Sequence, residues 1–251
     1  MLDIISAKLA EIEKEENVRV IYAVESGSRA WGFASPDSDY DVRFIYARPK
    51  EFYLKLEKTR DVIEWQLDET LDINGWDLQK TLRLIHSSNP TIFEWNRSPI
   101  VYKTTPEWDS VRAGMPEYFQ TKAGLYHYYS TGLNQYRIYF KGETVKLKKY
   151  FYVLRPLLAC KWILNKKCPP PVLFGELVET ELEQDIKPIV DDLLRQKTDA
   201  PETGEIKHIG DLNGYIEKNF VSLKAAIDGL PGERNTGWDG LNKLFLSIIN
   251  Y

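Results

Sequence analysis

Cysteine and long apolar runs are what this sequence most clearly lacks. Only two cysteines, Cys160 and Cys168, occur among 251 residues, too few for a disulfide framework and without the spacing of a metal site. No stretch approaches the about 20 apolar residues that a membrane span requires. The first residues lack the basic start and apolar core of a signal peptide. These absences predict a protein of a reducing compartment, the cytoplasm, with no membrane as a partner.

Histidine is also scarce, and the chain has no excess of positive charge. The three histidines, His86, His127 and His208, are scattered without metal-ligand spacing, which argues against a histidine-based metal centre. The formal net charge of −4 excludes a general nucleic-acid coat protein. The charge is uneven, however: residues 137–167 carry nine bases and one acid, whereas residues 176–205 carry ten acids and three bases. This polarity indicates a protein that needs positive charge in one place.

What is abundant predicts a folded protein with a sizeable core. Hydrophobic residues make up 43% of the chain, with seven tryptophans and fifteen tyrosines. Leu2, Ile5 and Leu9 fall at helical spacing, so the chain is expected to open with an amphipathic helix. Short apolar runs that predict strands follow at residues 18–24, from about 41 to 47, at 62–67 and at 70–73.

The later part of the chain has helical periodicity. Residues 126–140 and 146–164 have the length and pattern of helices, and helical spacing resumes from Leu212. The expected fold class is therefore α/β (α+β). A catalytic domain with a small mixed β-sheet is expected over residues 1–106, followed by a mostly helical domain over residues 107–251.

Two carboxylates follow a small-residue turn in the N-terminal part. Gly27 and Ser28 come shortly after the first strand, and Asp39 and Asp41 precede the next. Alternate residues of an extended chain point to one side, so the two carboxylates repel each other unless a cation lies between them. A Gly-Ser turn offers backbone N–H groups, a hydroxyl and room for a phosphate. Together these residues predict a site for a metal-bound nucleoside triphosphate, with Gly27 and Ser28 on its β- and γ-phosphates.

This arrangement resembles the nucleotidyltransferase superfamily typified by DNA polymerase beta. The superfamily signature is Gly-Ser, then Asp-x-Asp and, further on, a third acidic residue between apolar ones. Gly-Ser-Arg-Ala-Trp-Gly at residues 27–32 and Ser-Asp-Tyr-Asp-Val-Arg at residues 38–43 look like a bacterial branch of predicted nucleotidyltransferases. Some members of that branch are associated with RNA-repair ligases. Further similar blocks occur at residues 72–78, 88–90, 94–95 and 149–157.

The resemblance implies three metal-binding carboxylates. Asp39 and Asp41 would hold the metal on the triphosphate, and Asp72 would complete a second metal site and accept the proton of the attacking hydroxyl. Glu64 has the same apolar-acid-apolar pattern and Asp77 lies near by, so both remain alternatives to Asp72. Asp72 is preferred because Asn74 is expected to cap a helix directly after it, with Asp77 as the acid three residues later.

Four cations are candidate phosphate ligands. Arg29 and Arg43 flank the carboxylates, and since Arg43 shares the face of Asp41 on an alternating strand, an ion pair between them is an equal alternative. Lys149 and Arg155 lie in the basic segment. Six helical residues turn through about 600°, so these two cannot share one face. Lys149 is expected to bind phosphate, and Arg155 is expected to be the more structural of the pair.

These features predict an enzyme, a nucleotidyltransferase that uses Mg²⁺ or Mn²⁺. Its substrate is a nucleoside triphosphate, with ATP expected, and it moves the monophosphate to an acceptor hydroxyl. The RNA association of the similar proteins favours an RNA end as acceptor. The alternative is a non-catalytic module of the same fold that senses a nucleotide or binds a partner, as an antitoxin does. The presence of all three carboxylates favours the enzyme.

Overall fold

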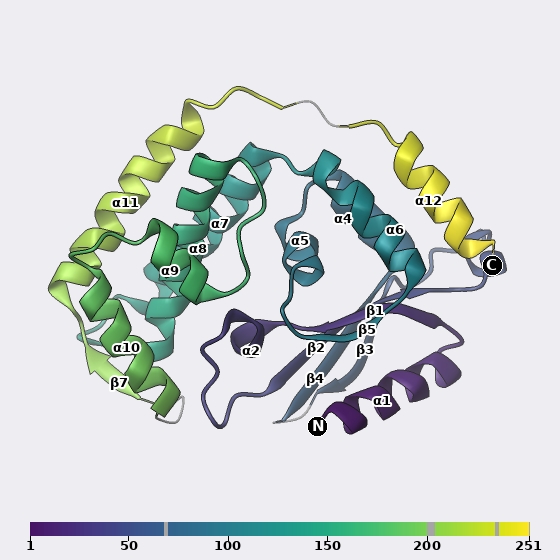
Figure 1. The fold of residues 1–251 in the computed structure, drawn as a ribbon, viewed down its shortest axis with the longest axis horizontal. Helices are drawn as coiled ribbons and strands as arrows, with labels where there is room; N and C mark the ends of the chain where they lie inside the picture. Colours follow the sequence, from purple (N-terminus) through teal and green to yellow (C-terminus); the bar gives the residue numbers. More distant parts are fainter. Residues whose placement is uncertain (68–69, 200–203, 234–235, 251) are drawn as a thin grey trace. The chain divides into compact units, whose positions relative to one another are not determined.

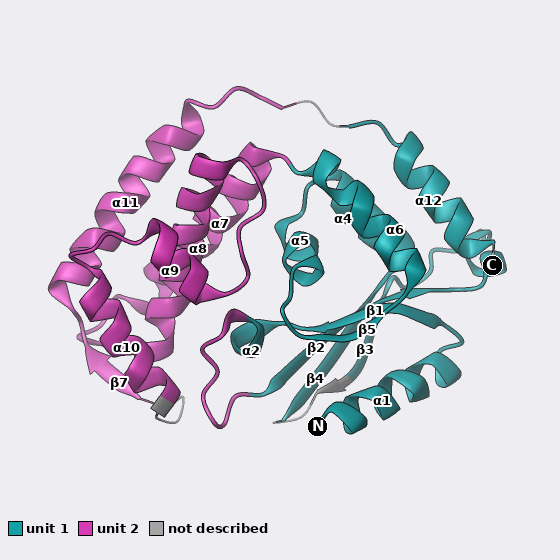
Figure 2. Ribbon diagram, viewed as in Figure 1, with its two compact units in different colours: residues 1–30, 39–119, 235–251 teal, residues 31–38, 120–234 magenta. Residues whose placement is uncertain are grey.

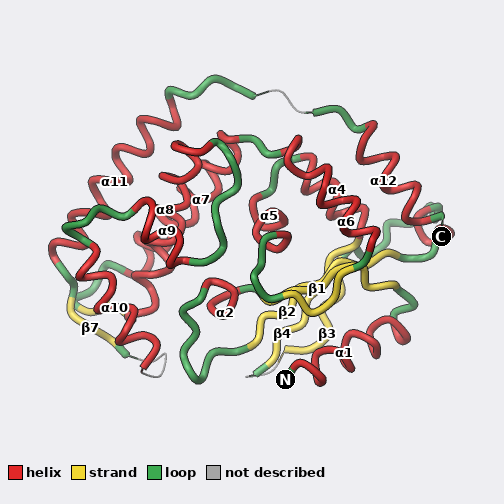
Figure 3. Tube along the Cα trace, viewed as in Figure 1, coloured by secondary structure: helices red, strands yellow, loops and turns green. Residues whose placement is uncertain are grey.

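A computed structural model describes residues 1–67, 70–199, 204–233 and 236–250. The secondary structure is mixed, with helices, strands and connecting loops throughout (Figures 1 and 3). The chain divides into two compact units (Figure 2). Unit 1 comprises Met1–Ala30, Asp39–Phe119 and Asn235–Tyr251, and unit 2 comprises Trp31–Ser38 and Gln120–Arg234.

Within the described residues, unit 1 is built on a five-stranded mixed sheet in the order β3-β4-β2-β1-β5. Strands β2 and β4 run parallel, and the other neighbouring strands run antiparallel. Because the predicted strands coincide with short apolar runs, their side chains fill both sides of the sheet. The strands are β1 (Arg19–Glu25), β2 (Tyr40–Ala47), β3 (Val62–Leu67), β4 (Leu71–Asp77) and β5 (Val101–Thr104).

Helices cover both faces of this sheet. On one face lies α1 (Leu2–Glu15) (Figure 1), which buries Ile5, Leu9 and Ile12, whereas Leu2, the first residue of the predicted stripe, is exposed. On the other face, Trp108 stacks on Tyr22 of β1 with ring centroids 4.5 Å apart. That second layer contains α4 (Leu78–His86), α5 (Pro90–Asn96), α6 (Pro106–Gly114), a 3₁₀ turn (Met115–Tyr118) and α12 (Asp239–Ile249). The shorter helices of unit 1 are α2 (Gly27–Trp31) and α3 (Lys50–Tyr53).

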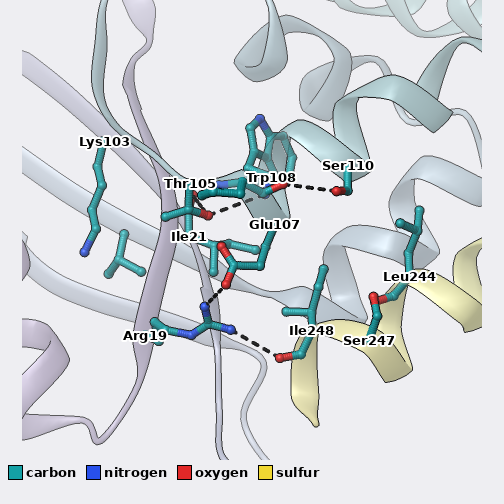
Figure 4. Close-up of polar contacts among 12 residues, drawn as sticks. Arg19, Ile21, Lys103, Thr105, Glu107, Trp108, Ser110, Leu244, Ser247 and Ile248 are labelled. Atoms are coloured by element: carbon teal, nitrogen blue, oxygen red, sulfur yellow. Dashed lines mark hydrogen bonds and ion pairs between the residues drawn. The ribbon is translucent and has the colours of Figure 1, made fainter. Parts of the chain in front are cut away.

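One arginine of β1 ties two of these helices together. The Arg19 guanidinium donates to the Glu107 carboxylate in α6 and, at 3.2 Å, to the Ile248 carbonyl in α12 (Figure 4). Beside it, Thr105 caps α6 and donates its hydroxyl to the Ile21 carbonyl at 3.1 Å. The C-terminal helix is therefore held on the sheet of the N-terminal strands by polar as well as apolar contacts.

Unit 2 is mostly helical. The α7 and α8 helices pack closely where Gly132 leaves room for Pro156: a methyl group on Gly132 would lie 3.2 Å from Pro156 Cγ. Two short strands, β6 and β7, pair antiparallel. The elements are α7 (Thr121–Tyr139), β6 (Thr144–Lys146), α8 (Leu147–Lys166), α9 (Phe174–Glu181), α10 (Lys187–Asp199), β7 (Glu205–Lys207) and α11 (Gly210–Asp228).

The mixed sheet followed by helices confirms the predicted fold class, but the division of the chain differs from the expected boundary at residue 106. The α6 helix and α12 belong to unit 1, because Trp108 and Leu241 share its core. Residues 31–38 belong to unit 2. The prediction that Asn74 caps a helix is wrong, since β4 continues through it and Asp77 is the N-cap of α4. None of the described helices is long and apolar enough to cross a membrane.

Candidate active site

Two of the three predicted carboxylates lie side by side on the parallel strands β2 and β4. Asp41 and Asp72 are directly opposite each other in the strand register. One guanidinium nitrogen of Arg43 donates to Asp41 Oδ1 and to Asp72 Oδ2, at 2.7 Å each. The three side chains are partly buried, with exposed fractions of 22% for Asp41, 26% for Asp72 and 18% for Arg43. Of the two roles weighed for Arg43, the structure shows the ion pair.

The Gly27 turn packs directly against this pair. Gly27 has a φ of +60°, a conformation that favours glycine. A methyl group at this position would lie 1.9 Å from Asp41 Oδ2, so no other residue fits without displacing the carboxylate. Ser28 follows in α2 and is 7% exposed. The predicted neighbourhood of the Gly-Ser turn and Asp41 is therefore present, and glycine is required there for both backbone and space.

A buried acid behind Asp41 was not anticipated. Glu25, at the end of β1, is 1% exposed; its Oε1 accepts the Asp41 N–H at 2.8 Å, and Oε2 accepts the Tyr102 hydroxyl. Burial raises the pKa of Glu25, although the hydrogen bonds from Tyr102 and the Asp41 N–H oppose this effect. The only local signal that could have identified it is its place, as an acid that ends an apolar run two residues before the Gly-Ser turn. Glu25 holds the backbone that carries Asp41.

Arg29 contacts the backbone of Asp39, the third predicted metal ligand. Its Nε donates to the Asp39 carbonyl at 2.9 Å, and its guanidinium carbon lies 3.8 Å from the centre of the Tyr40 ring. Asp39 is exposed and precedes β2 by one residue. Arg29 thus joins α2 to the residue that enters β2, whereas the Asp39 carboxylate is not part of the ion pair that Arg43 makes with the other two.

The alternatives to Asp72 have other roles in the structure. Glu64 accepts from Arg60 at 2.6 Å on the exposed side of β3. Asp77 accepts the Gln79 N–H at 2.7 Å as the N-cap of α4 and the Tyr53 hydroxyl at 2.9 Å. Asp72 alone of the three lies opposite Asp41.

The two cations predicted from the basic segment belong to unit 2. The Lys149 ammonium lies 3.6 Å from the centre of the Tyr139 ring and 5.0 Å from that of Tyr152. Arg155 is 4% exposed; its guanidinium carbon lies 4.6 Å from the Trp31 ring centre, and Nε donates to the Val172 carbonyl at 3.4 Å. Lys149 is half-buried on α8, and Arg155 is part of the unit 2 core.

The donor chemistry of the Asp41–Asp72 pair fits a divalent cation. Carboxylate oxygens are the ligands that Mg²⁺ prefers, and here two converge on one positive group, Arg43. Across the described residues, no three or more His, Cys, Asp and Glu side chains are grouped so that they could hold a metal ion. Asp41 and Asp72 are therefore candidate metal ligands, Arg43 balances part of their negative charge, and the Asp39 carboxylate is not grouped with them in this structure.

Comparison with known proteins identifies the family of this chain. The model of the RNA repair pathway DNA polymerase beta family (RlaP) matches residues 1–247. An uncharacterized protein, YcgL, from Bacillus subtilis (strain 168) is 43% identical over 246 residues, covering 96% of this chain and 94% of its own. A crystal structure of a nucleotidyltransferase-like protein from Exiguobacterium sibiricum 255-15 matches 100% of this chain and 80% of its own at 14% identity, with a TM-score of 0.32. The chain belongs to the RNA repair pathway DNA polymerase beta family.

Proposed function

We propose that this protein is a metal-dependent nucleotidyltransferase that transfers a nucleoside monophosphate from a nucleoside triphosphate, with ATP expected, to an acceptor hydroxyl at an RNA end. The observation that carries the proposal is the Asp41–Asp72 pair, in register on parallel strands, with Gly27 against Asp41. The family description favours RNA repair as the setting.

Asp41 and Asp72 are the residues that would hold the divalent cation, with Asp39 completing the set. Mg²⁺ or Mn²⁺ bound there supplies positive charge that offsets the charge developing on the attacking and leaving oxygens. Glu25 holds the Asp41 backbone through its N–H, which limits the freedom of the carboxylate. Arg43 restrains both carboxylates through one nitrogen, so their relative position is set before substrate arrives.

Asp72 is the proposed acceptor for the proton of the attacking hydroxyl. Its carboxylate lies partly exposed beside Asp41, whereas the Asp77 carboxylate is occupied by a helix N-terminus and a tyrosine hydroxyl. Gly27 and Ser28 are the proposed contacts of the β- and γ-phosphates. Of the cations, Arg29 and Lys149 are the proposed additional phosphate ligands, because Arg43 and Arg155 already have structural roles.

The test compares two neutralising substitutions on neighbouring strands. Asp41→Asn removes one proposed ligand, and Glu64→Gln removes a carboxylate on β3 that pairs only locally with Arg60. Each variant and the unaltered protein are incubated with labelled nucleoside triphosphates, Mn²⁺ and short RNAs with defined ends. We expect label on the RNA with the unaltered protein and Glu64→Gln, and none with Asp41→Asn. Transfer that survives in Asp41→Asn would refute the assignment.

One observation favours the non-catalytic alternative, a nucleotide-sensing or partner-binding module of antitoxin type. Arg43 neutralises part of the negative charge of both carboxylates, which lowers their attraction for a metal. Titration of the protein with Mn²⁺ and with ATP separates the two functions. ATP binding without Mn²⁺ binding and without transfer to RNA, protein or metabolite fractions would support the sensor.

A further inference from the structure

Two helices of unit 2, α7 and α11, flank a pocket whose residues have no part in the proposed function. Its volume of about 390 Å³ lies in the range of sites that hold small molecules or part of a larger one. Five of its eight lining residues are aromatic or aliphatic: Tyr129, Leu133, Tyr136, Phe220 and Val221. The other three are charged, so the pocket combines an apolar wall with ionised groups.

Aromatic rings form the wall of this pocket and are fixed by contacts with one another. Phe220 is 4% exposed, and the Tyr129 ring meets it edge-on with ring centroids 5.8 Å apart. The Tyr136 ring lies 6.2 Å from that of Phe220 and stacks on Phe140 at 4.7 Å. The Tyr136 hydroxyl also donates to Glu217 Oε1 in α11 at 2.7 Å. Rings held in this way offer flat apolar surface and lose little further freedom when a ligand binds.

One apolar residue of the pocket is left in water. Val221 is 73% exposed, although the residue before it in α11, Phe220, is buried. Single exposed apolar side chains are ordinary on a protein surface, but this one lines a pocket together with three aromatic rings. Apolar surface that is both exposed and recessed favours a site for a flat apolar ligand.

The charged residues of the pocket favour a ligand with a negative charge. Lys224 pairs with both carboxylate oxygens of Asp228, so its charge is balanced. Arg137 is exposed, and within the described part of the chain it makes no hydrogen bond or ion pair. A complementary ligand therefore has a flat ring with an anionic group beside it. A nucleotide unit of a nucleic acid has this composition, a base next to a phosphate.

We propose that this pocket, the α7–α11 pocket, holds an unpaired base of a single-stranded RNA, stacked on the tyrosine rings, with Arg137 on a neighbouring phosphate. Glu217 Oε2, which accepts no hydrogen bond from the residues that the structure describes, is the acceptor for an N–H of that base. The inference rests on the proposed function for the choice of RNA and goes beyond it by assigning a second binding site to the helical unit. Every base can stack when it is unpaired, so the site selects single strands and not a sequence.

The main experiment changes the pocket at its exposed apolar residue, where the fold is least affected. Val221→Glu places a carboxylate in the pocket, and Ser222→Glu is the matched control, since Ser222 is exposed, does not line the pocket and gains the same charge. Fluorescence anisotropy of the full chain, without metal or triphosphate, measures affinity for a labelled RNA of about ten nucleotides and for its blunt duplex. We expect the single strand to bind more tightly than the duplex. Val221→Glu should weaken single-strand binding about tenfold or more, and Ser222→Glu less than about twofold.

Two further variants separate stacking from charge. Tyr129→Leu removes a ring and keeps an apolar side chain, so it should weaken single-strand binding about tenfold. Tyr126→Leu is its control, because Tyr126 is an exposed tyrosine of the same helix that does not line the pocket. Arg137→Gln should reduce the slope of log affinity against log salt by about 0.7, the value for one phosphate of a single strand. Lys166→Gln, in the last turn of α8, makes the same change of charge and should leave the slope unchanged.

Equal single-strand affinities of Val221→Glu and Ser222→Glu would overturn the proposal, as would equal binding of strand and duplex. ATP binding that only Val221→Glu weakens would assign the pocket to a free nucleotide instead. Self-association that only Val221→Glu abolishes would assign it to a second copy of this chain. These measurements involve no transfer, so they succeed or fail separately from the proposed function. Asp41→Asn should bind the RNA as tightly as the unaltered protein while it loses transfer.

Discussion

The two ends of strand β4 carry carboxylates of the same chemistry, yet the structure uses them differently. Asp72, near the start, is partly exposed and shares the Arg43 guanidinium with Asp41. Asp77, at the end, is 3% exposed, caps α4 and accepts the Tyr53 hydroxyl. At Asp77 neutral donors satisfy the carboxylate, whereas the Asp72 carboxylate pairs with a cation that the Asp41 carboxylate shares.

This contrast separates a structural acid, Asp77, from the acid proposed to bind the metal, Asp72. A carboxylate that accepts hydrogen bonds from a helix N-terminal N–H and from a hydroxyl stabilises the fold. Its oxygens are then largely occupied and bind a further ligand poorly. Two carboxylates that share one guanidinium remain short of positive charge, which is the electrostatic condition for binding a divalent cation. The comparison predicts that neutralising Asp72 changes activity, whereas neutralising Asp77 changes stability.

The largest expected effect is on activity at the start of β4. Asp72→Asn should lower nucleotidyl transfer about a thousandfold, because a bound cation contributes several kcal/mol and each 1.4 kcal/mol is tenfold in rate. Thermal unfolding should change little, since the ion pair is partly exposed and Asn keeps the shape. Single-turnover transfer and a thermal scan of the same preparations measure the two properties.

Asp77→Asn is the matched control at the other end of β4, because it makes the same chemical change. It should retain transfer while changing the unfolding profile. Loss of transfer in Asp77→Asn with retention in Asp72→Asn would reverse the assignment of the two acids.

The next largest effect concerns Asp41, which lies opposite Asp72 in the strand register. Gly27→Ala places a methyl group 1.9 Å from Asp41 Oδ2 and strains a φ of +60°, so Asp41 must move. A displacement of about 1 Å at a reacting site costs on the order of a hundredfold in rate, and backbone strain of this kind costs about 1–3 kcal/mol of stability. Transfer assays and urea unfolding test both numbers.

Gly214→Ala in α11 is the control for Gly27→Ala, because a methyl group there meets nothing within 4 Å. It should leave transfer intact and, as a glycine replaced within a helix, add up to about 1 kcal/mol of stability. Equal losses of transfer in the two variants would show that the contact with Asp41 is not what matters.

Local signals were sufficient for the strands and for the Gly-Ser turn. Runs of β-branched residues predict β1 and β2, and the burial of both agrees. Asn74 and Asp77 form a plausible capping pair, so the local sequence predicts the helix start too early. The parallel pairing with β2, from Arg43–Asn74 to Tyr46–Asp77, extends β4 through Asn74 instead. That pairing is non-local and leaves no signal near Asn74 itself.

Long-range contacts account for what the sequence could not predict at the site. Glu25 and Tyr102 meet from strands far apart in the chain, and Ser35 meets Lys197. No sequence motif marks either pair, because each of these residue types is common in the kind of segment where it lies. The return of α12 to the N-terminal sheet, through Arg19 and Ile248, likewise depends on a contact that no local pattern records.

A smaller effect, on pH dependence, sharpens the comparison at the structural end of β4. Burial raises the pKa of Asp77, although hydrogen bonds from the Gln79 N–H and Tyr53 oppose the shift. As the pH rises from the unfolded value of about 3.9 through the raised folded pKa, the unfolded chain loses this proton first, so Asp77 makes folding less favourable. The unfolding free energy of the unaltered protein minus that of Asp77→Asn should therefore fall as the pH rises from 4 to 7. Urea titrations of both proteins give this difference, and a rise would contradict the sign.

The smallest expected effect extends the contrast to the cations. Arg43 pairs with two carboxylates, whereas the Lys149 ammonium lies over the rings of Tyr139 and Tyr152 and is the proposed triphosphate ligand. Lys149→Ala should weaken nucleoside triphosphate binding by roughly two- to fivefold, the scale of one solvent-screened charge. It should also reduce the salt dependence of that binding. Lys166→Ala, at the exposed end of α8, changes the same net charge and should alter neither. If Lys149→Ala instead lowers the melting temperature and leaves triphosphate affinity unchanged, the lysine serves the packing of the tyrosine rings, and the triphosphate site draws its positive charge from Arg29 and the metal.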